Sequence, residues 1–299
     1  MYIKNFYQQI NNSELYTRYV CKLFNLHLEC ENYIEAAHSL DLLSNLLNWS
    51  DEPVPLYLVA NIYHDYRSNY TFKEALFEDI ITYLDKGRMW NAALSYCKEL
   101  SKIYEHQVQD YQKLSNILKK MAQFYDNIMN ETFPEAEYFC IYYYGRGFPC
   151  FLQYKTFIYR WRMTEKLRDF NTHIQRLFPN ANLVNVAPGS EIKESSSQNI
   201  YIRQVYPVFN DKKYKDLPIH GQILRHLLES DLKIFYCSTP LITQDSSEYE
   251  NSSLRLCNSR TIYCTSVSFP GILVQAPVVS TESHEISPIK NFIDEIKRN

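Results

Sequence analysis

The spacing of apolar residues changes from a helical to an extended pattern near Thr132, and this change most constrains the fold of the chain. Before Thr132, apolar residues recur three or four positions apart in about five stretches, and each stretch predicts a helix with one apolar stripe. After Glu137, short runs rich in aromatic and β-branched residues predict strands. Helices with one apolar stripe must pack on one another, so we expect an α+β chain: an N-terminal antiparallel α-helical array followed by a lobe of antiparallel β-sheets.

Capping signals predict where several of these helices begin and end. Asn32 precedes Glu35 by three residues, and Thr71 precedes Glu74 by three, as in capping boxes. Gly87 predicts the end of the helix that follows Thr71. The apolar stripes begin near Ser13, Ala36, Phe72, Trp90 and Tyr111.

The second half predicts strands, two short helices and a set of boundaries. The strands are expected at 138–144, 151–160, 200–206, 232–237, 260–267 and 272–278, the short helices at 164–177 and 219–228, and loops at 195–197 and 244–253. We therefore expect a helical array over residues 1–131, a β lobe over 132–285, and the first turns of a truncated helical lobe over 286–299, where Ser287 precedes Pro288.

Composition excludes several classes of protein. A hydrophobic content of 45% and a charged content of 22% are typical of a globular chain. The net charge of -3 over 299 residues gives no reason to expect nucleic acid or an anionic membrane as a partner. No apolar run resembles a signal peptide or a membrane span, and the eight scattered cysteines suit a reducing compartment, so we expect a cytoplasmic protein. The 26 tyrosines indicate either compositional drift or a large protein-binding surface.

Motifs for catalysis or cofactor binding are not found, so we expect neither a bond-making enzyme nor a cofactor. His220 and His226 precede Cys237, but they lack metal-site spacing, and ordinary surface or core positions are the favoured interpretation. Gly145-Arg-Gly147 is too short to hold a phosphate and indicates a hairpin turn.

Several strings, in order along nearly the whole chain, carry a family resemblance. The most specific is Tyr143-Tyr-Gly-Arg-Gly-Phe-Pro149, and Phe157-Ile-Tyr-Arg160 follows it. Earlier comes Tyr83-Leu-Asp-Lys-Gly-Arg-Met-Trp90, and later comes Pro270-Gly-Ile-Leu273. With these strings the chain resembles the DOCKER domain (DOCK homology region two) of dedicator-of-cytokinesis (DOCK) proteins. The details are closer to the Rac-directed subfamilies than to the Cdc42-directed ones.

The resemblance implies part of a guanine-nucleotide exchange factor for a Rho-family small GTPase, Rac more than Cdc42. A helical lobe would support the module and mediate homodimerisation, and a pair of antiparallel sheets would meet the GTPase. The third lobe, which carries the nucleotide sensor, would be missing here, so we expect little exchange activity from these residues alone. The alternative is a non-catalytic scaffold or protein-interaction module.

The resemblance also points to particular residues. The segment 254–266 falls where the β lobe would contact the GTPase, and Leu256, Arg260 and Tyr263 are the candidate contact residues. The alternative is that Leu256 and Tyr263 pack within a strand and that Arg260 is a structural hydrogen-bond donor. Four residues of the family signature are expected to be structural: Trp90, Gly145, Phe148 and Pro149.

Overall fold

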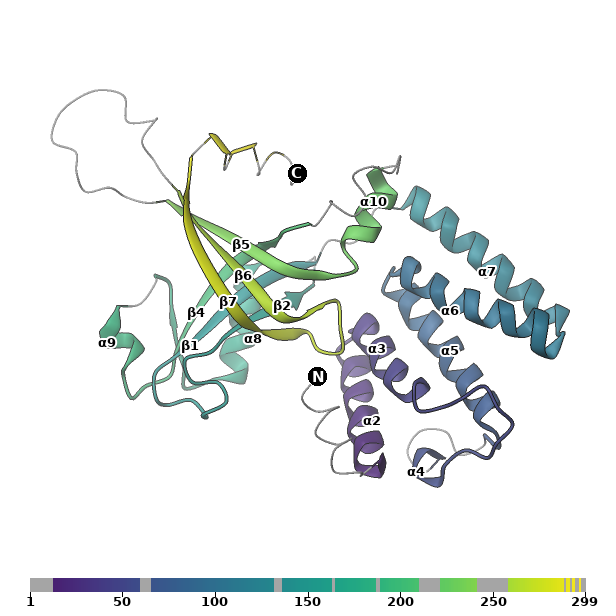
Figure 1. The fold of residues 1–299 in the computed structure, drawn as a ribbon. Coiled ribbons are helices and arrows are strands. Elements are labelled where there is room, and N and C mark those ends of the chain that lie inside the picture. The colour runs from purple at the N-terminus through teal and green to yellow at the C-terminus, as the bar shows by residue number, and fades with distance from the viewer. Residues whose placement is uncertain are drawn as a thin grey trace. The chain divides into compact units, whose positions relative to one another are not determined.

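The computed structural model describes residues 13–59, 66–131, 136–162, 165–186, 189–209, 221–240, 258–287, 289–290, 292–293 and 296 (Figure 1). These residues form two compact units. The helical unit takes in the described residues within Met1–Pro134, Asp211–Ser230 and Pro270–Leu273, and the β unit takes in those within Glu135–Asn210, Asp231–Phe269 and Val274–Asn299. The expected α+β order, a helical array followed by antiparallel sheets, is confirmed.

The helical unit is an array of helices around one apolar core. Leu40, Phe72 and Leu76 are buried, as the sequence indicated. In the helix that begins near Tyr111 the core residue is Phe124, whereas Tyr111, Leu118 and Tyr125, which were expected on the packed stripe, are exposed. A π-helical turn, η1 (Tyr104–Val108), ends α6 and leads into the long helix α7. The helices are α2 (Ser13–Glu29), α3 (Tyr33–Ser44), α4 (Leu56–Val59), α5 (Asn69–Lys86), α6 (Trp90–Ile103), α7 (Tyr111–Asn130) and α10 (Gly221–Leu228).

The caps correct two of the predicted helix starts. Ser68, not Thr71, caps α5, because the Ser68 hydroxyl accepts a hydrogen bond from the Thr71 backbone N–H at 3.3 Å. Asn32 does precede α3, but its side chain makes no capping hydrogen bond. The capping-box pattern therefore located both helices to within a few residues without identifying the capping contacts.

Gly87 ends α5 as predicted, but for a packing reason. Its φ is -80°, and the following residue, Arg88, takes the left-handed conformation with φ 57°. A Cβ at Gly87 would lie 2.4 Å from Cγ1 of Ile34. Glycine is needed here because α3 passes close to the end of α5.

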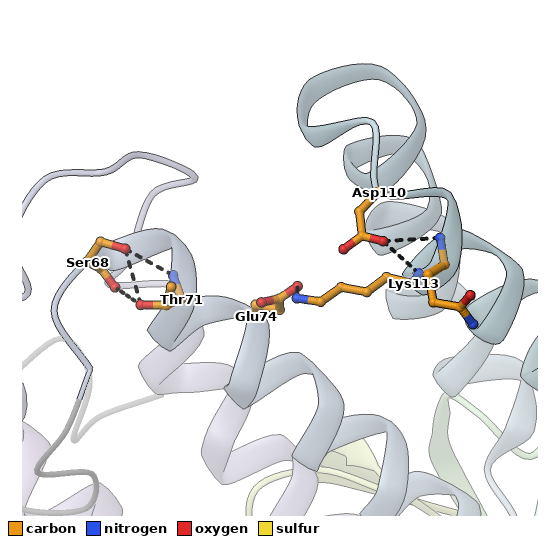
Figure 2. Close-up of polar contacts among 6 residues, drawn as sticks. Ser68, Thr71, Glu74, Asp110 and Lys113 are labelled. Carbon is orange, nitrogen blue, oxygen red and sulfur yellow. Dashed lines mark hydrogen bonds and ion pairs between the residues drawn. The ribbon is translucent and has the colours of Figure 1, made fainter.

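An ion pair between a half-exposed lysine and a nearly buried glutamate joins α5 to α7 (Figure 2). Lys113 Nζ donates to Glu74 Oε1 at 2.8 Å, and the Glu74 side chain is only 11% exposed. Asp110 starts α7 by accepting from the backbone N–H groups of Gln112 and Lys113 at 3.1 and 3.0 Å. The same Lys113 thus takes part in the start of α7 and in its attachment to α5.

Two later segments belong to the helical unit, although they fall within the range 132–285 expected to form the β lobe. In α10, the His226 ring lies 5.7 Å from the Trp90 ring. In the segment Pro270–Leu273, the backbone carbonyl of Ile272 accepts from His27 Nε2 at 2.8 Å. Both histidines are buried, so each of these segments meets the helices at a buried imidazole.

The β unit contains two sheets that share two strands. Around the ring of pairings, β1 pairs with β2 and β4, β2 with β7, β7 with β6, β6 with β5, and β5 with β4, all antiparallel; β3 is added parallel to β4. Both β4 and β7 pair in one sheet at one end and in the other sheet at the other end. The strands are β1 (Glu137–Tyr144), β2 (Thr156–Trp161), β3 (Asn182–Val184), β4 (Asn199–Pro207), β5 (Leu232–Pro240), β6 (Asn258–Phe269) and β7 (Gln275–Ile286); the helices are α8 (Leu167–Leu177) and α9 (Ser190–Lys193).

Strand β1 is buried on both faces. Tyr138 and Cys140 point into a core with Phe235 and Phe269. The alternate residues, Phe139, Ile141 and Tyr143, join a second core with Phe170 and Ile174 of α8. Because successive side chains of a strand point to opposite faces, a continuous aromatic run serves two cores at once.

Two predicted strands differ from the observed ones. Residues 151–154 form turns, and β2 begins only at Thr156. The aromatic residues of this run resembled a strand, but Tyr154 lies at φ 55°, outside the extended region. Strand β7 begins at Gln275, not at residue 272, and continues to Ile286. The loop expected at 244–253 and most of the expected C-terminal helix lie outside the described residues.

Candidate functional site

Strand β6 carries the described part of the segment 254–266, which the sequence singled out. The described residues of this strand begin at Asn258, so Leu256 lies outside them. Strand β6 pairs with β5 on one side and with β7 on the other, and a register irregularity falls between Cys264 and Thr265. Arg260 and Tyr263 therefore sit in the middle strand of a three-stranded region.

Arg260 lies flat against an aromatic ring. Its guanidinium carbon is 4.4 Å from the centre of the Tyr236 ring, and its Nε donates to the Ser238 hydroxyl at 3.3 Å. Its register partners are Ser238 on β5 and His284 on β7. The side chain is 9% exposed, so the guanidinium is held at a fixed place over Tyr236.

Tyr263 belongs to the core. Its side chain is 1% exposed, and its hydroxyl lies 2.6 Å from the Tyr142 hydroxyl and 3.2 Å from Cys237 Sγ. Burial raises the pKa of both Tyr142 and Tyr263 well above the usual range of a tyrosine. These hydroxyls stay protonated, and they satisfy one another inside the apolar core.

The structure does not bring Arg260 and Tyr263 together. They are three residues apart on one strand, so they point to opposite faces, as their separate contacts show. A direct contact between Tyr263 and a partner would require its ring to leave the core. This result could have been predicted from the sequence, because residues separated by an odd number of positions on a strand point to opposite faces.

Arg260 shares its sheet face with a set of half-exposed apolar side chains. Register and alternation place Tyr236 and Ile262 beside it, with Ile234 and Cys264 next along the strands. The Tyr236 ring also packs at 5.8 Å against Tyr206 of β4. We call this surface the Arg260 face, defined by Ile234, Tyr236, Arg260, Ile262 and Cys264. Reasoning from sequence missed Tyr236 and Tyr206, since the pairing of β5 with β4 and β6 was not known.

The four signature residues have packing or turn roles in the structure. Trp90 is buried, and its Nε1 donates to Asp85 Oδ1 at 2.8 Å. Gly145 lies at φ 96°, and a Cβ there would lie 2.0 Å from the backbone oxygen of Ser197. Phe148 is buried against Tyr143 and Phe178, whereas Pro149 is exposed and its carbonyl accepts from the Leu152 N–H at 2.8 Å.

The outer side of α7 exposes an apolar stripe. Tyr111, Leu118, Tyr125 and Met129 are all 45% exposed or more. They follow one another at seven, seven and four residues, so they lie on one side of the helix, while Ile117, Phe124 and Ile128 face the core. We call these four residues the α7 stripe.

The described residues contain neither a metal-site candidate nor a membrane span. No group of three or more His, Cys, Asp or Glu side chains there could hold a metal ion. Of the histidines noted in the sequence, His226 packs on Trp90, and His220 lies outside the described residues. None of the described helices is both long enough and apolar enough to cross a lipid bilayer.

Comparison with known proteins gives matches to both parts of the chain. Residues 1–130 match the family model "DHR-2, Lobe A". Human dedicator of cytokinesis protein 3 is 33% identical over 300 residues, covering 99% of this chain and 14% of that protein. Human dedicator of cytokinesis protein 4 is 31% identical over 302 residues, covering 97% of this chain and 15% of that protein. DOCK-like protein 1 of Saccharomyces cerevisiae is 21% identical over 293 residues, covering 95% of this chain and 15% of that protein.

The chain spans about one seventh of the length of these relatives. The helical match agrees with the helices α2 to α7, which end at Asn130. The similarity to proteins 3 and 4 continues through the β unit. The chain is therefore similar along nearly its whole length to one segment of the dedicator of cytokinesis proteins, and its first 130 residues match the DHR-2 lobe A family.

Proposed function

We propose that these residues form part of a cytoplasmic guanine-nucleotide exchange module that acts on a Rho-family GTPase, Rac in preference to Cdc42. The match to DHR-2 lobe A and the similarity to dedicator of cytokinesis proteins 3 and 4 support the proposal. The helical unit serves as support and as a dimerisation lobe, and the β unit supplies part of the docking surface for the GTPase.

The observation that carries the docking proposal is the Arg260 face. A half-exposed apolar patch around one immobilised arginine is typical of the centre of a protein interface, where arginine and aromatic residues contribute most to affinity. Leu256 and Arg260 are the proposed contact residues. Tyr263 acts from the opposite face as a positioning residue, because its buried hydroxyl contacts fix β6 against β1 and β5.

The proposed mechanism is one of differential binding and involves no bond-making chemistry. An exchange factor binds the nucleotide-free GTPase more tightly than the nucleotide-bound form, and this difference in affinity shifts the GTPase towards release. We assign docking to the β unit and the release step to no residue of this chain. Residues 1–299 alone should thus bind the GTPase and accelerate nucleotide release little.

The test is binding of the purified chain to nucleotide-free Rac and nucleotide-free Cdc42 by interferometry. We expect tighter binding to Rac, and we expect Arg260→Ala to weaken it about tenfold or more, as for an interface hot spot. The matched control is Arg168→Ala, which removes an exposed arginine of α8 in the same unit. Equal affinity of wild type and Arg260→Ala for Rac, with unchanged circular dichroism, would exclude the Arg260 face as the docking site.

The α7 stripe supports the dimerisation part of the proposal. An exposed apolar stripe with heptad spacing is suited to a second helix of the same kind. We expect the wild-type chain to be dimeric by light scattering and Leu118→Glu/Tyr125→Glu to be monomeric, with Lys119→Glu as the control on the same helix. A dimer that binds neither GTPase would favour the scaffold function instead, and a stripe variant that stays dimeric would exclude this surface.

A further inference from the structure

The connection between β1 and β2 exposes two aromatic side chains at the end of the β unit. Phe151 is 66% exposed and Tyr154 is 53% exposed. Their neighbours Phe148 and Leu152 point the other way, into the core shared with α8. The turn therefore alternates two anchored apolar residues with two that project outward.

The turn is held rigidly. The Gln153 side-chain amide donates to the backbone carbonyls of Arg146 and Phe148 at 2.9 and 2.7 Å. The Tyr154 N–H donates to the Tyr143 carbonyl at 2.9 Å, although Tyr154 lies at φ 55°, a conformation that is costly for a bulky residue. Strain of this kind persists where the surrounding contacts fix it, so Phe151 and Tyr154 are presented at little further entropic cost on binding.

Basic residues lie in and beside this turn, and one of them, Lys193, has its Nζ 5.6 Å from the centre of the Tyr144 ring. Arg146 and Lys155 flank the turn and are exposed. Lys193 of α9 is adjacent, because the Gly145 N–H donates to its carbonyl at 3.0 Å. Arg176, with the exposed Leu177, lies at the end of α8, where the following residue, Phe178, packs 5.7 Å from Phe148.

Two carboxylates, Glu191 and Glu194 of α9, are also nearby and exposed, so the cations are in excess locally. No ion pair or side-chain hydrogen bond of the described residues uses the charged end of Arg146 or Lys155. We call the surface made by Arg146, Phe151, Tyr154, Lys155 and Leu177 the aromatic tip. The net charge of the whole chain, -3, did not predict this surface, because a net charge contains no information on where charged residues cluster.

We propose that the aromatic tip inserts shallowly into an anionic lipid surface. The combination fits the interface of a bilayer, where amphipathic rings sit at the level of the headgroups and lysine or arginine attracts acidic lipids. A protein partner is less well matched, because a stable protein interface needs about 800 Å² on each side. The two projecting rings of the β1–β2 connection, with Leu177 at the end of α8, offer far less, yet they suit insertion among lipid headgroups.

This inference goes beyond the proposed function and does not depend on it. It gives the β unit a membrane contact at the β1–β2 connection, whereas the Arg260 face lies on β5 and β6. A module that acts on a lipid-anchored substrate would gain from an orienting contact of this kind, but the vesicle experiment below needs no GTPase.

The first test is co-sedimentation of the full chain with vesicles of mixed phosphatidylserine and phosphatidylcholine, with pure phosphatidylcholine vesicles alongside. We expect binding only with phosphatidylserine, and weaker binding at high salt. Phe151→Ala/Tyr154→Ala should weaken binding about tenfold, and Arg146→Glu/Lys155→Glu should abolish it. Matched controls change equally exposed residues elsewhere, Leu26→Ala/Val279→Ala for the apolar pair and Lys22→Glu/Lys102→Glu for the charged pair.

The second test distinguishes insertion from electrostatic adsorption. Cys150 is exposed next to Phe151, so a nitrobenzoxadiazole dye on its thiol reports the polarity at the tip. In a background of Cys30→Ser, Cys257→Ser and Cys264→Ser, we expect a blue shift and a rise in emission when the phosphatidylserine vesicles are added. The same dye on Cys30, with Cys150→Ser, should not respond.

Three results would overturn the proposal. The first is an absence of binding to phosphatidylserine vesicles, which would leave the tip as a surface for a protein. The second is an aromatic variant that binds as tightly as wild type, or controls that weaken binding as much as the tip variants do. The third is an unshifted dye on Cys150 in the vesicle-bound protein, since adsorption without insertion leaves the dye in water.

Discussion

The helical unit and the β unit bury their apolar residues in different ways. The long helices of the first unit each bury one stripe and leave the opposite side mostly polar, apart from the α7 stripe and the exposed Tyr19 and Leu26 of α2. Strand β1 of the second unit is buried on both faces, between two aromatic-rich cores. A one-sided element can be recognised from its own sequence period, whereas an element buried on both sides shows a continuous apolar run whose partners are not evident.

This contrast predicts that the β unit tolerates backbone changes less well than the helical unit. The largest effect is expected at Gly145, and Gly87 in the helical unit serves as the comparison. At Gly145 a Cβ would meet a backbone oxygen at 2.0 Å and the φ of 96° disfavours alanine, so Gly145→Ala should destabilise the β unit by about 3 kcal/mol or more. At Gly87 a Cβ would meet the movable side chain of Ile34, so Gly87→Ala should cost about 1 kcal/mol.

Hydrogen exchange in increasing urea, followed by mass spectrometry, measures the two glycine variants unit by unit. Gly145→Ala should lower protection in the peptides of β1 and β4 and leave α5 unchanged. The contrast would fail if Gly87→Ala proved as costly as Gly145→Ala.

A smaller effect is expected at the ion pair that joins α5 to α7. Glu74 is nearly buried and accepts from Lys113 at 2.8 Å, so Glu74→Ala should cost about 1.5 kcal/mol in urea unfolding. The matched control is Glu131→Ala, which removes the 3.6 Å pair with Arg88. Both partners of that pair are about half exposed, so we expect a change within about 0.5 kcal/mol. Equal losses of unfolding free energy in the two variants would contradict a larger contribution from the pair of Glu74 and Lys113.

Acidification should destabilise the helical unit through His27 and His226, by less than the Glu74 variant does. Burial lowers the pKa of both side chains, and hydrogen bonds to the backbone of Ile272 and Glu131 oppose this only in part. The unfolded chain takes up these protons near pH 6.5 and the folded unit only at lower pH, so stability is complete above about 6.5 and falls as the pH decreases below it.

Urea unfolding of the helical unit at pH 7.5 and 5.5 tests the acid effect. In His27→Gln the difference between the two pH values should shrink. Glu35, whose charge partly opposes the pKa shift of His27, stays unchanged in that variant. In the β unit, burial also lowers the pKa of His173, but this side chain is partly exposed, so a smaller loss is expected there. If acidification lowered the unfolding free energy of the β unit more than that of the helical unit, the prediction would be wrong.

The smallest effect is expected at the two helix starts. Ser68→Ala should cost about 0.5–1 kcal/mol, because its hydroxyl accepts from the Thr71 N–H. Asn32→Ala should be nearly neutral, since its side chain makes no capping bond. Thermal unfolding of the two variants measures the difference directly, and a cost at Asn32 equal to that at Ser68 would show that the capping-box pattern of the sequence is the better guide.

Much of the helical unit could be predicted from the sequence, because each stripe repeats with the helical period. Residues such as Leu40, Phe72 and Leu76 were thereby placed in the core, but in α7 the spacing indicated Tyr111, Leu118 and Tyr125, which are exposed. The caps were predicted less well, since Ser68 competes with Thr71 and only the geometry decides between them. In the β unit most strand positions were predicted, but the short strand β3 was missed. The run at 151–154 was wrong, because its aromatic residues form a turn that contacts both core and surface.

The candidate site was predicted only as a segment. The family resemblance pointed to β6, yet it grouped Arg260 with Tyr263, which point to opposite faces. The partner that holds Arg260, Tyr236, comes from another strand, and pairing between distant segments is not contained in local spacing. The aromatic tip could not be predicted either, because tertiary packing decides which apolar residues of the turn are buried and which are exposed.

The two strands that pair in both sheets have a consequence for how the β unit can be altered. Because β4 and β7 each continue from one sheet into the other, no single cut in the chain yields two separable sheets. Circular permutation, fragment complementation or grafting of one sheet onto another scaffold would each leave a strand with half its neighbours missing. The β unit must therefore be exchanged between proteins as a whole, because neither sheet is complete without the strands β4 and β7 that it shares with the other.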